Sequence, residues 1–424
     1  MTTVYDEFTW RGIVYDATEG LADLVAKERV TAYIGFDPTA SSLHVGSLLP
    51  AMALARLQRF GHAPIAIVGG GTGMIGDPSG KSQERTLLSR EEIEANLAGI
   101  RQQLSKLLDF ERPANPARIV NNADWLASVD LLTFLRDAGK HFTVNYMLQK
   151  EAVNRRLESE EGISFTEFSY LLLQAYDFVQ LFDRYGCVLQ MGGSDQWGNI
   201  TAGIDLIRKL RGKKAHGLVM PLVTTVSGVK FGKTEAGAIW LDPGRTSPFR
   251  FYQFWLNTDD RDVVSYLKYF TFLDRVAVEG LEAATKTGPE KREAQRALAR
   301  EVTTLVHGAN QTARAERASA VLFSEAIDTL SVEDILSVFD DVPSTELEYE
   351  GFARDGLGLV DIVARAQLAP SKSEARRLVQ SGGVYVNNRR MEDPQARLTR
   401  DQAIGGRLFV LRKGQKQNHL IRLT

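Results

Sequence analysis

The residues best suited to chemistry near the start of the chain are Thr39 and His44. They follow an apolar run, Val30–Phe36, that predicts a strand, and they precede Gly46 and an apolar helical pattern that begins near Leu48. Nucleotides bind at the carboxyl end of a parallel strand, where the next helix start favours negative charge. A histidine there can donate to a phosphate oxygen, and a glycine leaves room for a flat base. The alternative is a histidine that only caps or packs.

A second polar segment, far along the chain, contains Lys230, Lys233 and Thr234. Alone, two lysines in a loop indicate a solvated turn more often than a site. Combined with the histidine segment, they resemble the two signatures of class I aminoacyl-tRNA synthetases, the HIGH-type and KMSKS-type motifs. We therefore expect a loop hinged at Gly228 and Gly232 that is mobile until ATP binds.

A glycine-rich turn after the second predicted strand, Ala63–Val68, contains a literal G-x-G-x-x-G at Gly71, Gly73 and Gly76. Such a match suggests a dinucleotide site, but it needs a helix to follow at once, and none is indicated. A P-loop is also disfavoured, because Ile75 stands where that motif requires glycine. What remains is an open turn that lets a ligand approach the backbone, with Asp77 placed to meet a cation.

The helix predicted from Ser164 to Tyr185 carries Tyr170, Gln174 and Asp177 at spacing i, i+4, i+7, so these three side chains share one face. One interpretation is a solvent face. However, the many apolar residues of this helix leave little room for a wide polar face. If the stripe is enclosed, its polar groups require partners, and a ligand can supply them.

The pattern Tyr170-x-x-x-Gln174-x-x-Asp177, followed by the run Gly192–Asn199, resembles the bacterial-type tyrosyl-tRNA synthetases. The resemblance extends over essentially the whole chain. It implies a tyrosine–tRNA ligase that activates L-tyrosine with ATP to tyrosyl-adenylate and transfers the tyrosyl group to the 3′ end of tRNA(Tyr). The implied partners are L-tyrosine, ATP with Mg²⁺, tRNA(Tyr) and a second copy of the chain in a homodimer.

The resemblance also implies roles for individual residues. The tyrosine-binding residues would be Tyr33, Asp77, Tyr170, Gln174, Asp177 and Gln196. The ATP and adenylate site would be lined by Gly35, Asp37, Gly46, Ser47, Asp195, Lys81 and Arg85. The catalytic residues would be Thr39, His44, Lys230, Lys233 and Thr234.

Three positions depart from the family pattern. Ser47 replaces the second histidine of the first signature, and Ile34 cannot offer the ribose contact that a thiol gives in some relatives. Pro50 lies close to the predicted helix start, where an interior proline would cost about 3 kcal/mol. We therefore expect either a kink or a helix that begins near Leu48.

Charge is distributed unevenly along the chain. The 424 residues contain 51 Lys and Arg against 53 Asp and Glu, a formal net charge of −2 that by itself argues against a nucleic-acid partner. Residues 351–424, however, contain 14 basic against 6 acidic side chains, a net charge of +8, whereas residues 1–350 contain 37 against 47, a net charge of −10. The basic block, which resembles an S4 RNA-binding domain, therefore predicts an RNA partner.

Within the basic block, Ser371 and Glu374 predict the start of a helix that ends before two glycines, and a strand and a turn follow. The candidate RNA-binding residues are Lys372, Arg376 and Arg377 on the helix and Arg389 and Arg390 in the turn. The alternative interpretation is an ordinary solvated helix face.

The remaining composition excludes several classes of protein. The single cysteine, Cys187, excludes a disulfide framework and a multi-cysteine metal site, and the six histidines are scattered. We therefore expect neither a metal site of the protein itself nor a prosthetic group. No signal-peptide pattern and no run of about 18 uncharged apolar residues is present, so the sequence predicts a cytoplasmic protein that does not enter a membrane.

Short strands alternate with helices in the first half of the chain and predict an α/β fold with a doubly wound parallel sheet. We expect a Rossmann-like catalytic domain in 1–225, a helical domain that includes the lysine loop in 226–340, an acidic linker in 341–356 and an S4-like α/β domain in 357–424. Two other functions remain open. They are an RNA-binding protein on an inactive synthetase scaffold and a nucleotide-dependent oxidoreductase.

Overall fold

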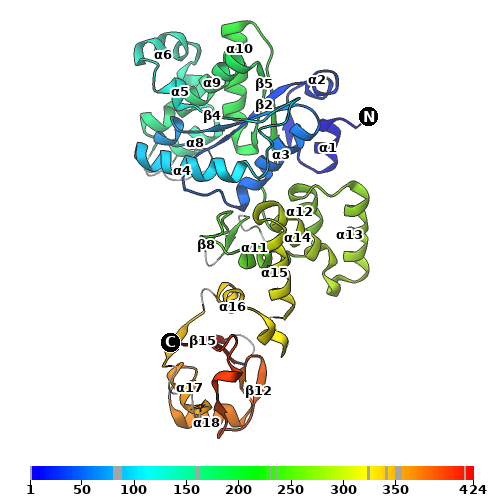
Figure 1. Ribbon diagram of the computed structural model, residues 1–424. Helices are drawn as coiled ribbons and strands as arrows, with labels where there is room; N and C mark the ends of the chain where they lie inside the picture. Colours follow the sequence, from blue (N-terminus) through cyan, green and yellow to red (C-terminus); the bar gives the residue numbers. More distant parts are fainter. Residues whose placement is uncertain are drawn as a thin grey trace. The chain divides into compact units, whose positions relative to one another are not determined.

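The computed structural model describes residues 2–79, 88–158, 160, 162–226, 228, 231–234, 237–321, 325–339, 342–348, 356–414 and 417–424. The chain divides into two compact units (Figure 1). Unit 1 comprises Met1–Thr246 and Trp255–Val306, and unit 2 comprises Ser247–Phe254 and His307–Thr424.

Unit 1 is built on a six-stranded sheet with the strand order β1-β6-β5-β2-β3-β4. Its strands are β1 (Asp16–Ala17), β2 (Thr31–Phe36), β3 (Ala63–Val68), β4 (Arg118–Asn121), β5 (Cys187–Gly193) and β6 (His216–Met220). All neighbouring pairs are parallel except β1 with β6. Strands β3 and β4 follow β2 on one side, and β5 and β6 lie on the other side, so the strand order reverses between β2 and β5. The sheet confirms the predicted fold class. Because ligands bind at such a switch point, a site is expected at the carboxyl ends of β2 and β5.

Helices connect these strands and cover the sheet. The helices before the lysine loop are α1 (Val4–Trp10), α2 (Leu21–Lys27), α3 (Leu48–Arg59), α4 (Arg90–Leu104), α5 (Ala123–Leu126), α6 (Leu131–Asp137), α7 (Val144–Leu148), α8 (Glu151–Leu157), α9 (Phe165–Tyr185) and α10 (Trp197–Arg211). Helices α9 and α10 pack over alternate strand residues, among them Tyr33, Ile65 and Ile67. Figure 1 shows α3 on the opposite side of the strands.

Helix α9 matches its predicted bounds because both ends are encoded locally. The Ser164 hydroxyl accepts a hydrogen bond from the Glu167 N–H at 3.2 Å, and Gly186 ends the helix with a φ of 60°. Helix α3 begins at Leu48, as the position of Pro50 required, after a short 3₁₀ turn at Val45–Ser47. The proline thus falls in the first helical turn, where no intrahelical N–H bond is lost.

The middle of the chain is helical, as predicted. A two-stranded ribbon, β7 (Lys233–Thr234) with β8 (Gly237–Ala238), comes first. The helices that follow are α11 (Pro248–Leu256), α12 (Val263–Phe270), α13 (Arg275–Thr287), α14 (Glu293–His307), α15 (Ala309–Val321) and α16 (Val332–Val338).

Unit 2 contains a five-stranded sheet with the order β12-β11-β14-β15-β9. Its elements are β9 (Ser344–Leu347), α17 (Leu359–Arg365), α18 (Lys372–Gln380), β11 (Val384–Val386), β12 (Arg389–Met391), β14 (Leu408–Lys413) and β15 (Gln417–Leu423), and β10 (Leu357–Gly358) pairs with β13 (Arg397–Leu398). One apolar core joins the sheet to α17 and α18, and a second joins it to α16.

Two features of unit 2 differ from the sequence expectations. Arg389 and Arg390 lie in strand β12 and not in the turn, because Asn387 and Asn388 alone form the two-residue turn with φ values of 47° and 63°. Within the segment expected to be a linker, Ser344–Leu347 forms β9, which pairs in parallel with β15. The domain boundaries themselves stay a prediction.

Candidate active site

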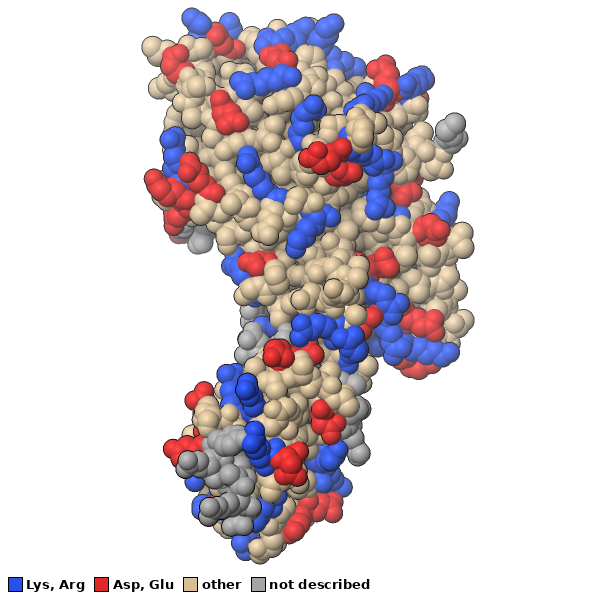
Figure 2. Space-filling model, in the orientation of Figure 1, with Lys and Arg blue, Asp and Glu red and all other residues tan. Residues whose placement is uncertain are grey.

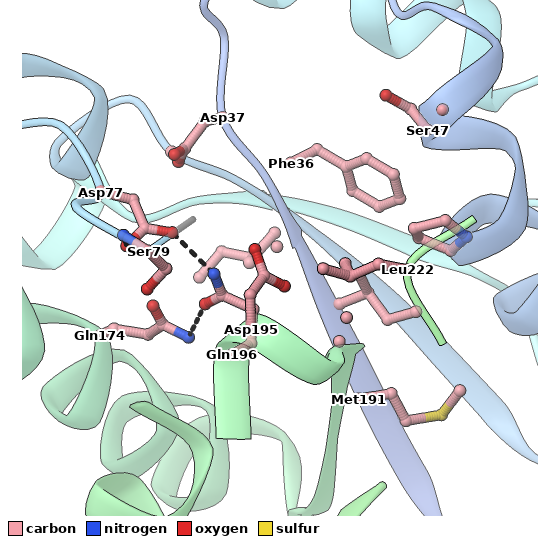
Figure 3. Close-up of a pocket in the computed structure, with 18 of the residues that line it drawn as sticks. Phe36, Asp37, Ser47, Asp77, Ser79, Gln174, Met191, Asp195, Gln196 and Leu222 are labelled. Atoms are coloured by element: carbon pink, nitrogen blue, oxygen red, sulfur yellow. Dashed lines mark hydrogen bonds between the residues drawn. The ribbon is translucent and has the colours of Figure 1, made fainter. Parts of the chain in front are cut away.

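A cavity of about 620 Å³ opens at the carboxyl ends of β2 and β5 (Figure 3). Its lining includes the predicted residues Tyr33, Gly35, Asp37, Thr39, His44, Gly46, Ser47, Asp77, Tyr170, Gln174, Asp177, Asp195 and Gln196. The three departures from the family pattern, Ile34, Ser47 and Pro50, line it as well. The structure thus brings together residues as far apart in the sequence as Tyr33 and Gln196, because β2 and β5 are neighbours where the strand order reverses.

One wall of the cavity holds a buried carboxylate beside a buried phenol. Asp177 is 3% exposed, and its two oxygens accept hydrogen bonds from Asn122 Nδ2 at 2.9 Å and Trp125 Nε1 at 2.7 Å. The Tyr33 hydroxyl is buried and has no hydrogen-bond partner among the described residues. Its ring packs edge-on against Phe178, with 5.2 Å between the centroids. A ligand hydroxyl can satisfy both groups, because it can donate to the carboxylate and accept from the phenol.

Burial controls the protonation of this pair. It raises the pKa of Asp177 to about 7, although the hydrogen bonds from Asn122 and Trp125 act to lower it. Burial, and next the charge of Asp177, also raise the pKa of the Tyr33 phenol well above its usual value. Tyr33 therefore stays a hydrogen-bond donor at neutral pH, whereas the protonation of Asp177 depends on the hydrogen bonds that a ligand adds.

A network of amides joins a second carboxylate in the same cavity. Gln196 Nε2 donates to Asp77 Oδ2 at 2.7 Å, and Gln174 Nε2 donates to Gln196 Oε1 at 3.2 Å (Figure 3). Asn199 Nδ2 donates to Gln174 Oε1 at 3.0 Å. Asp77 also accepts from the Ser79 N–H at 2.9 Å. The network fixes the amide orientations and places acceptor oxygens together, an arrangement that suits an ammonium group.

The His44 segment has a defined hydrogen-bond geometry. His44 is the N-cap of the short turn before α3, and its Nδ1 accepts from the Gly46 N–H at 3.0 Å. Nδ1 is therefore unprotonated, and Nε2 carries the proton of the neutral ring. A Cβ on Gly46 would lie 2.6 Å from Cε1 of His44, so only glycine allows the ring to fold back in this way. The capping role, one of the two interpretations, is thus present in the structure, and it engages Nδ1 and not Nε2.

Helix α4 supports the loop that carries this segment, a role that the sequence did not reveal. Asn96 Nδ2 donates to the Pro38 carbonyl at 2.9 Å, and Gln103 Oε1 accepts from the Leu43 N–H at 2.8 Å. A Cβ on Gly99 would lie 2.0 Å from the Ser41 carbonyl oxygen, so the helix can approach the loop only at a glycine.

The glycine-rich turn is packed at Gly70 and Gly71, whereas Gly69 and Thr72 line the cavity, so only part of it is open as expected. The Gly71 N–H donates to Asn122 Oδ1 at 2.7 Å, and a Cβ on Gly70 would lie 2.1 Å from Asn121 Oδ1. The glycines there make room for side chains at the end of β4. Within the described residues, the glycine run enters the three-residue turn Thr72–Met74 and does not lead directly into a long helix, as the dinucleotide motif requires.

Several predicted residues cannot be placed. Lys81, Arg85 and Lys230 lie outside the described residues, and of Lys233 and Thr234 only the backbone in β7 is described. The predicted hinge residues Gly228 and Gly232 have φ values of 78° and 79°, a conformation that favours glycine. Between them, Phe231 is buried and stacks on Phe270 with 5.2 Å between centroids.

Sequence reasoning missed three further residues of the cavity region. Asn122 and Trp125 follow the carboxyl end of β4, a strand that was not predicted from the sequence. A polar residue after a strand is the signal that could have indicated Asn122. Asn199 lies in the run Gly192–Asn199 that carried the family resemblance, but no role was inferred for it.

The basic residues predicted to bind RNA all lie in unit 2, with different partners. Lys372 pairs with Asp361, and Arg389 pairs with Asp328 at 2.9 Å. Arg390 donates to the Gly382 carbonyl at 3.1 Å and also contacts Glu392 at 3.2 Å. Arg376 and Arg377, on helix α18, are exposed and form no ion pair with another residue that the structure describes.

Two kinds of feature are absent from the described residues. No group of three or more His, Cys, Asp or Glu side chains there is arranged to hold a metal ion. No helix in the described part of the chain is long and apolar enough to cross a membrane.

The chain thus combines a parallel sheet, a cavity at its switch point and a histidine folded back against a glycine. The family model for class I tRNA synthetases (W and Y) matches residues 26–324, so the chain has the class I synthetase fold. The model for the C-terminal domain of tyrosine–tRNA ligases of the SYY type matches residues 334–421.

Individual relatives narrow the assignment. The chain is 58% identical over 424 residues to the tyrosine–tRNA ligase of Roseiflexus castenholzii, covering 100% of both chains, and 54% identical over 421 residues to that of Geobacillus kaustophilus, covering 98% of both. Among solved structures, a C-terminally truncated mitochondrial tyrosyl-tRNA synthetase from Aspergillus nidulans is 32% identical with a TM-score of 0.69, and the match covers 76% of this chain and 95% of that one. The chain belongs to the bacterial-type tyrosyl-tRNA synthetase family.

Proposed function

We propose that this protein ligates L-tyrosine to tRNA(Tyr) in two steps, through a tyrosyl-adenylate. The observation that carries the proposal is the enclosed pair of Tyr33 and Asp177, which offers one donor and one acceptor to a phenolic hydroxyl. A site built to bond a hydroxyl rejects the analogue that lacks it, because its buried groups are then left unpaired.

The second part of the substrate meets the amide network. Asp77 and Gln174 supply acceptor oxygens for the tyrosine ammonium group, with Gln196 and Asn199 fixing their orientation. Tyr170 is 5% exposed and lines the same wall. The phenol and the ammonium group thus define the position of the carboxylate that reacts.

In the first step an oxygen of the tyrosine carboxylate attacks the α-phosphorus of ATP, the bond to the β-phosphate oxygen breaks, and pyrophosphate leaves with the electron pair. Held reactants and oriented donors make this step fast, since negative charge increases on the phosphate oxygens. Thr39 and His44, through Nε2, are donors of the required type, and Lys230, Lys233 and Thr234 would close over the phosphates. Lys81 and Arg85 would meet the departing pyrophosphate.

Gly35, Asp37, Gly46, Ser47 and Asp195 form the remainder of the proposed nucleotide site. They all line the cavity around the ends of β2 and β5. Mg²⁺ accompanies ATP as part of the substrate and neutralises phosphate charge. The expectation that the protein holds no metal or prosthetic group of its own stays a prediction.

In the second step a terminal ribose hydroxyl of tRNA attacks the tyrosyl carbonyl and releases AMP. Unit 2 would bind the tRNA body through its basic block, where Arg376 and Arg377 are exposed and form no ion pair with a described residue. On the face shown in Figure 2, basic and acidic side chains are intermixed over unit 2, so RNA contacts there would be local and not spread over one uniform patch.

A homodimer is supported by exposed apolar side chains in unit 1. Among the described residues, large apolar side chains exposed over part of their surface are concentrated between positions 131 and 165, namely Leu131, Leu132, Leu135, Val144, Leu157 and Phe165. Phe165 is 78% exposed and Leu132 is 77% exposed. Exposed apolar side chains of this kind mark association surfaces. Sedimentation equilibrium measures the mass of the assembly directly. The cytoplasmic location stays a prediction of the sequence.

One assay separates the proposal from its rivals. Tyrosine-dependent exchange of labelled pyrophosphate into ATP requires adenylate formation, so a tyrosine–tRNA ligase performs it. A nucleotide-dependent oxidoreductase and an inactive RNA-binding scaffold do not. The packed glycine turn and the full-length relatives favour the ligase.

A further inference from the structure

The chain after β8 returns alongside the His44 segment. Val45 N–H donates to the Ile239 carbonyl at 2.9 Å, and Leu241 N–H donates to the Leu43 carbonyl at 2.9 Å. His44 and Trp240 are therefore directly opposed in an isolated antiparallel bridge. Opposed residues in such a bridge place their side chains on the same face, close enough to touch.

The indole of Trp240 occupies the space beside the imidazole of His44. The two ring centroids are 6.2 Å apart with an interplanar angle of 68°, an edge-on arrangement. The guanidinium of Arg245 lies over the indole, with Cζ 3.4 Å from the ring centroid. The Trp240 N–H of the main chain donates to Thr246 Oγ1 at 3.0 Å, so both the backbone and the ring of Trp240 are held.

The His44 imidazole is thus constrained from two sides. The Gly46 N–H holds Nδ1, and the indole limits rotation of the ring away from that bond. Trp240 does not itself line the cavity, whereas His44 does. Trp240 can therefore influence a bound phosphate only through His44.

The same short ladder reaches the lysine segment. Ile239 N–H donates to the Gly232 carbonyl at 3.1 Å, and a Cβ on Gly232 would lie 2.5 Å from Cγ2 of Val45. The backbone just before Lys233 is therefore in register with the backbone that carries His44. The ladder links the two segments proposed to contact ATP.

We propose that Trp240 is a positioning residue for His44, which fixes the imidazole so that Nε2 meets the phosphates of ATP in the transition state of tyrosine activation. The inference rests on the proposed function. It adds that the segment after the lysine loop, through this indole, contributes to the first step without touching either substrate.

The test measures single-turnover formation of tyrosyl-adenylate by the full-length protein with Trp240→Ala, Trp240→Phe, His44→Ala and the double variant His44→Ala/Trp240→Ala. A displacement of about 1 Å can reduce a rate by up to 10²-fold, and we expect Trp240→Ala to lose about tenfold. Trp240→Phe keeps an aromatic edge beside the imidazole and should recover most of that loss. The Kd for tyrosine should be unchanged in all four variants, because the tyrosine contacts lie elsewhere in the cavity.

The double variant distinguishes positioning from simple stabilisation. If Trp240 acts through His44, adding Trp240→Ala to His44→Ala produces no further loss. The matched control is Trp10→Ala, since Trp10 also contacts an arginine, with Arg11 Cζ 4.7 Å from its ring, but does not line the cavity, and its rate should equal that of the wild type. If Trp240→Ala does not fold, as judged by circular dichroism, Trp240→Leu carries the same comparison.

Two outcomes overturn the inference: a normal rate in Trp240→Ala or Trp240→Leu, or losses that multiply in the double variant. Failure of the proposed function is recognised separately, because the wild-type protein would then form no adenylate from tyrosine and ATP.

Discussion

Replacing Asp177 by Asn tests how the cavity selects tyrosine. The carboxylate receives hydrogen bonds on both oxygens, from Trp125 Nε1 at 2.7 Å and Asn122 Nδ2 at 2.9 Å, and it is 3% exposed. An asparagine has one oxygen and one NH₂ group at these positions. Whichever way the amide is turned, its NH₂ group therefore faces one of these two donors. That NH₂ group cannot accept a hydrogen bond from the substrate phenol, as the carboxylate oxygen at the same position can.

The structure sets the size of the effect. A hydrogen bond to a charged group contributes about 1.5–3 kcal/mol, and this is the bond that the substrate hydroxyl loses. At 1.36 kcal/mol per factor of ten, kcat/KM for tyrosine should fall by about 10- to 150-fold. Phenylalanine has no hydroxyl to pair with Asp177, so its kcat/KM should change far less. The tyrosine-to-phenylalanine ratio should therefore fall by about the same factor.

The assay is amino-acid-dependent pyrophosphate exchange, with tyrosine and phenylalanine each titrated to give kcat/KM. The control is Asp183→Asn on the same helix, since Asp183 pairs with Arg211 at 2.6 Å on the surface and does not line the cavity. It should leave the ratio unchanged. An unchanged ratio in Asp177→Asn would refute the reasoning and move the phenol pocket elsewhere.

Four further predictions follow from the same geometry. In the folded state the pKa of Asp177 is raised from 3.8 to about 7. Between about pH 4 and pH 7 only the folded state keeps that proton, so the free energy of unfolding without tyrosine should fall as the pH rises through this range. Chemical denaturation of Asp177→Asn should show no such fall. The Kd for tyrosine, measured by equilibrium dialysis, should rise by up to about tenfold per pH unit below pH 7, and a flat profile would contradict the ionised acceptor. Gly99→Ala places a methyl group against the Ser41 carbonyl oxygen and should slow adenylate formation while α4 stays helical, whereas Gly280→Ala, at a helical glycine with open space around it, should have no effect. Arg376→Gln with Arg377→Gln should weaken tRNA binding, reduce its salt slope by about two and leave pyrophosphate exchange normal, and an unaltered slope in filter binding would exclude these arginines from the RNA surface.

The sequence predicted those parts of the fold whose signals are local. Helix α9 was predicted at its observed bounds, because its apolar pattern continues without a break between Ser164 and Gly186. The parallel sheet and the residues at the ends of β2 and β5 also followed, since alternating strands and helices restrict the possible topologies.

Contacts between distant segments could not be predicted in this way. The partners of Asp177, which are Asn122 and Trp125, are more than fifty positions away and meet it only because the segment that follows β4 lies against α9 in the fold. The fit of Gly99 against Ser41 depends on how closely a helix approaches a loop, and a glycine in a helical pattern does not reveal its neighbour.

The basic block illustrates a third limit. Its net charge predicted an RNA partner, but charge counting cannot show which cations are already paired. Lys372 and Arg389 form ion pairs with acidic residues, and Arg390 is held in β12 against the end of α18, so the candidates differ in availability. Such pairing depends on side-chain positions that only the folded structure provides.

The central claim is that the cavity activates tyrosine with ATP. Labelled pyrophosphate, ATP and each of the amino acids in turn, incubated with the full-length protein, test it most directly. The proposed site predicts incorporation of label into ATP that requires tyrosine and that is weak with phenylalanine, because only tyrosine has a hydroxyl that would pair with Tyr33 and Asp177, which line the cavity. Exchange that did not depend on tyrosine, or no exchange with any amino acid, would contradict the account.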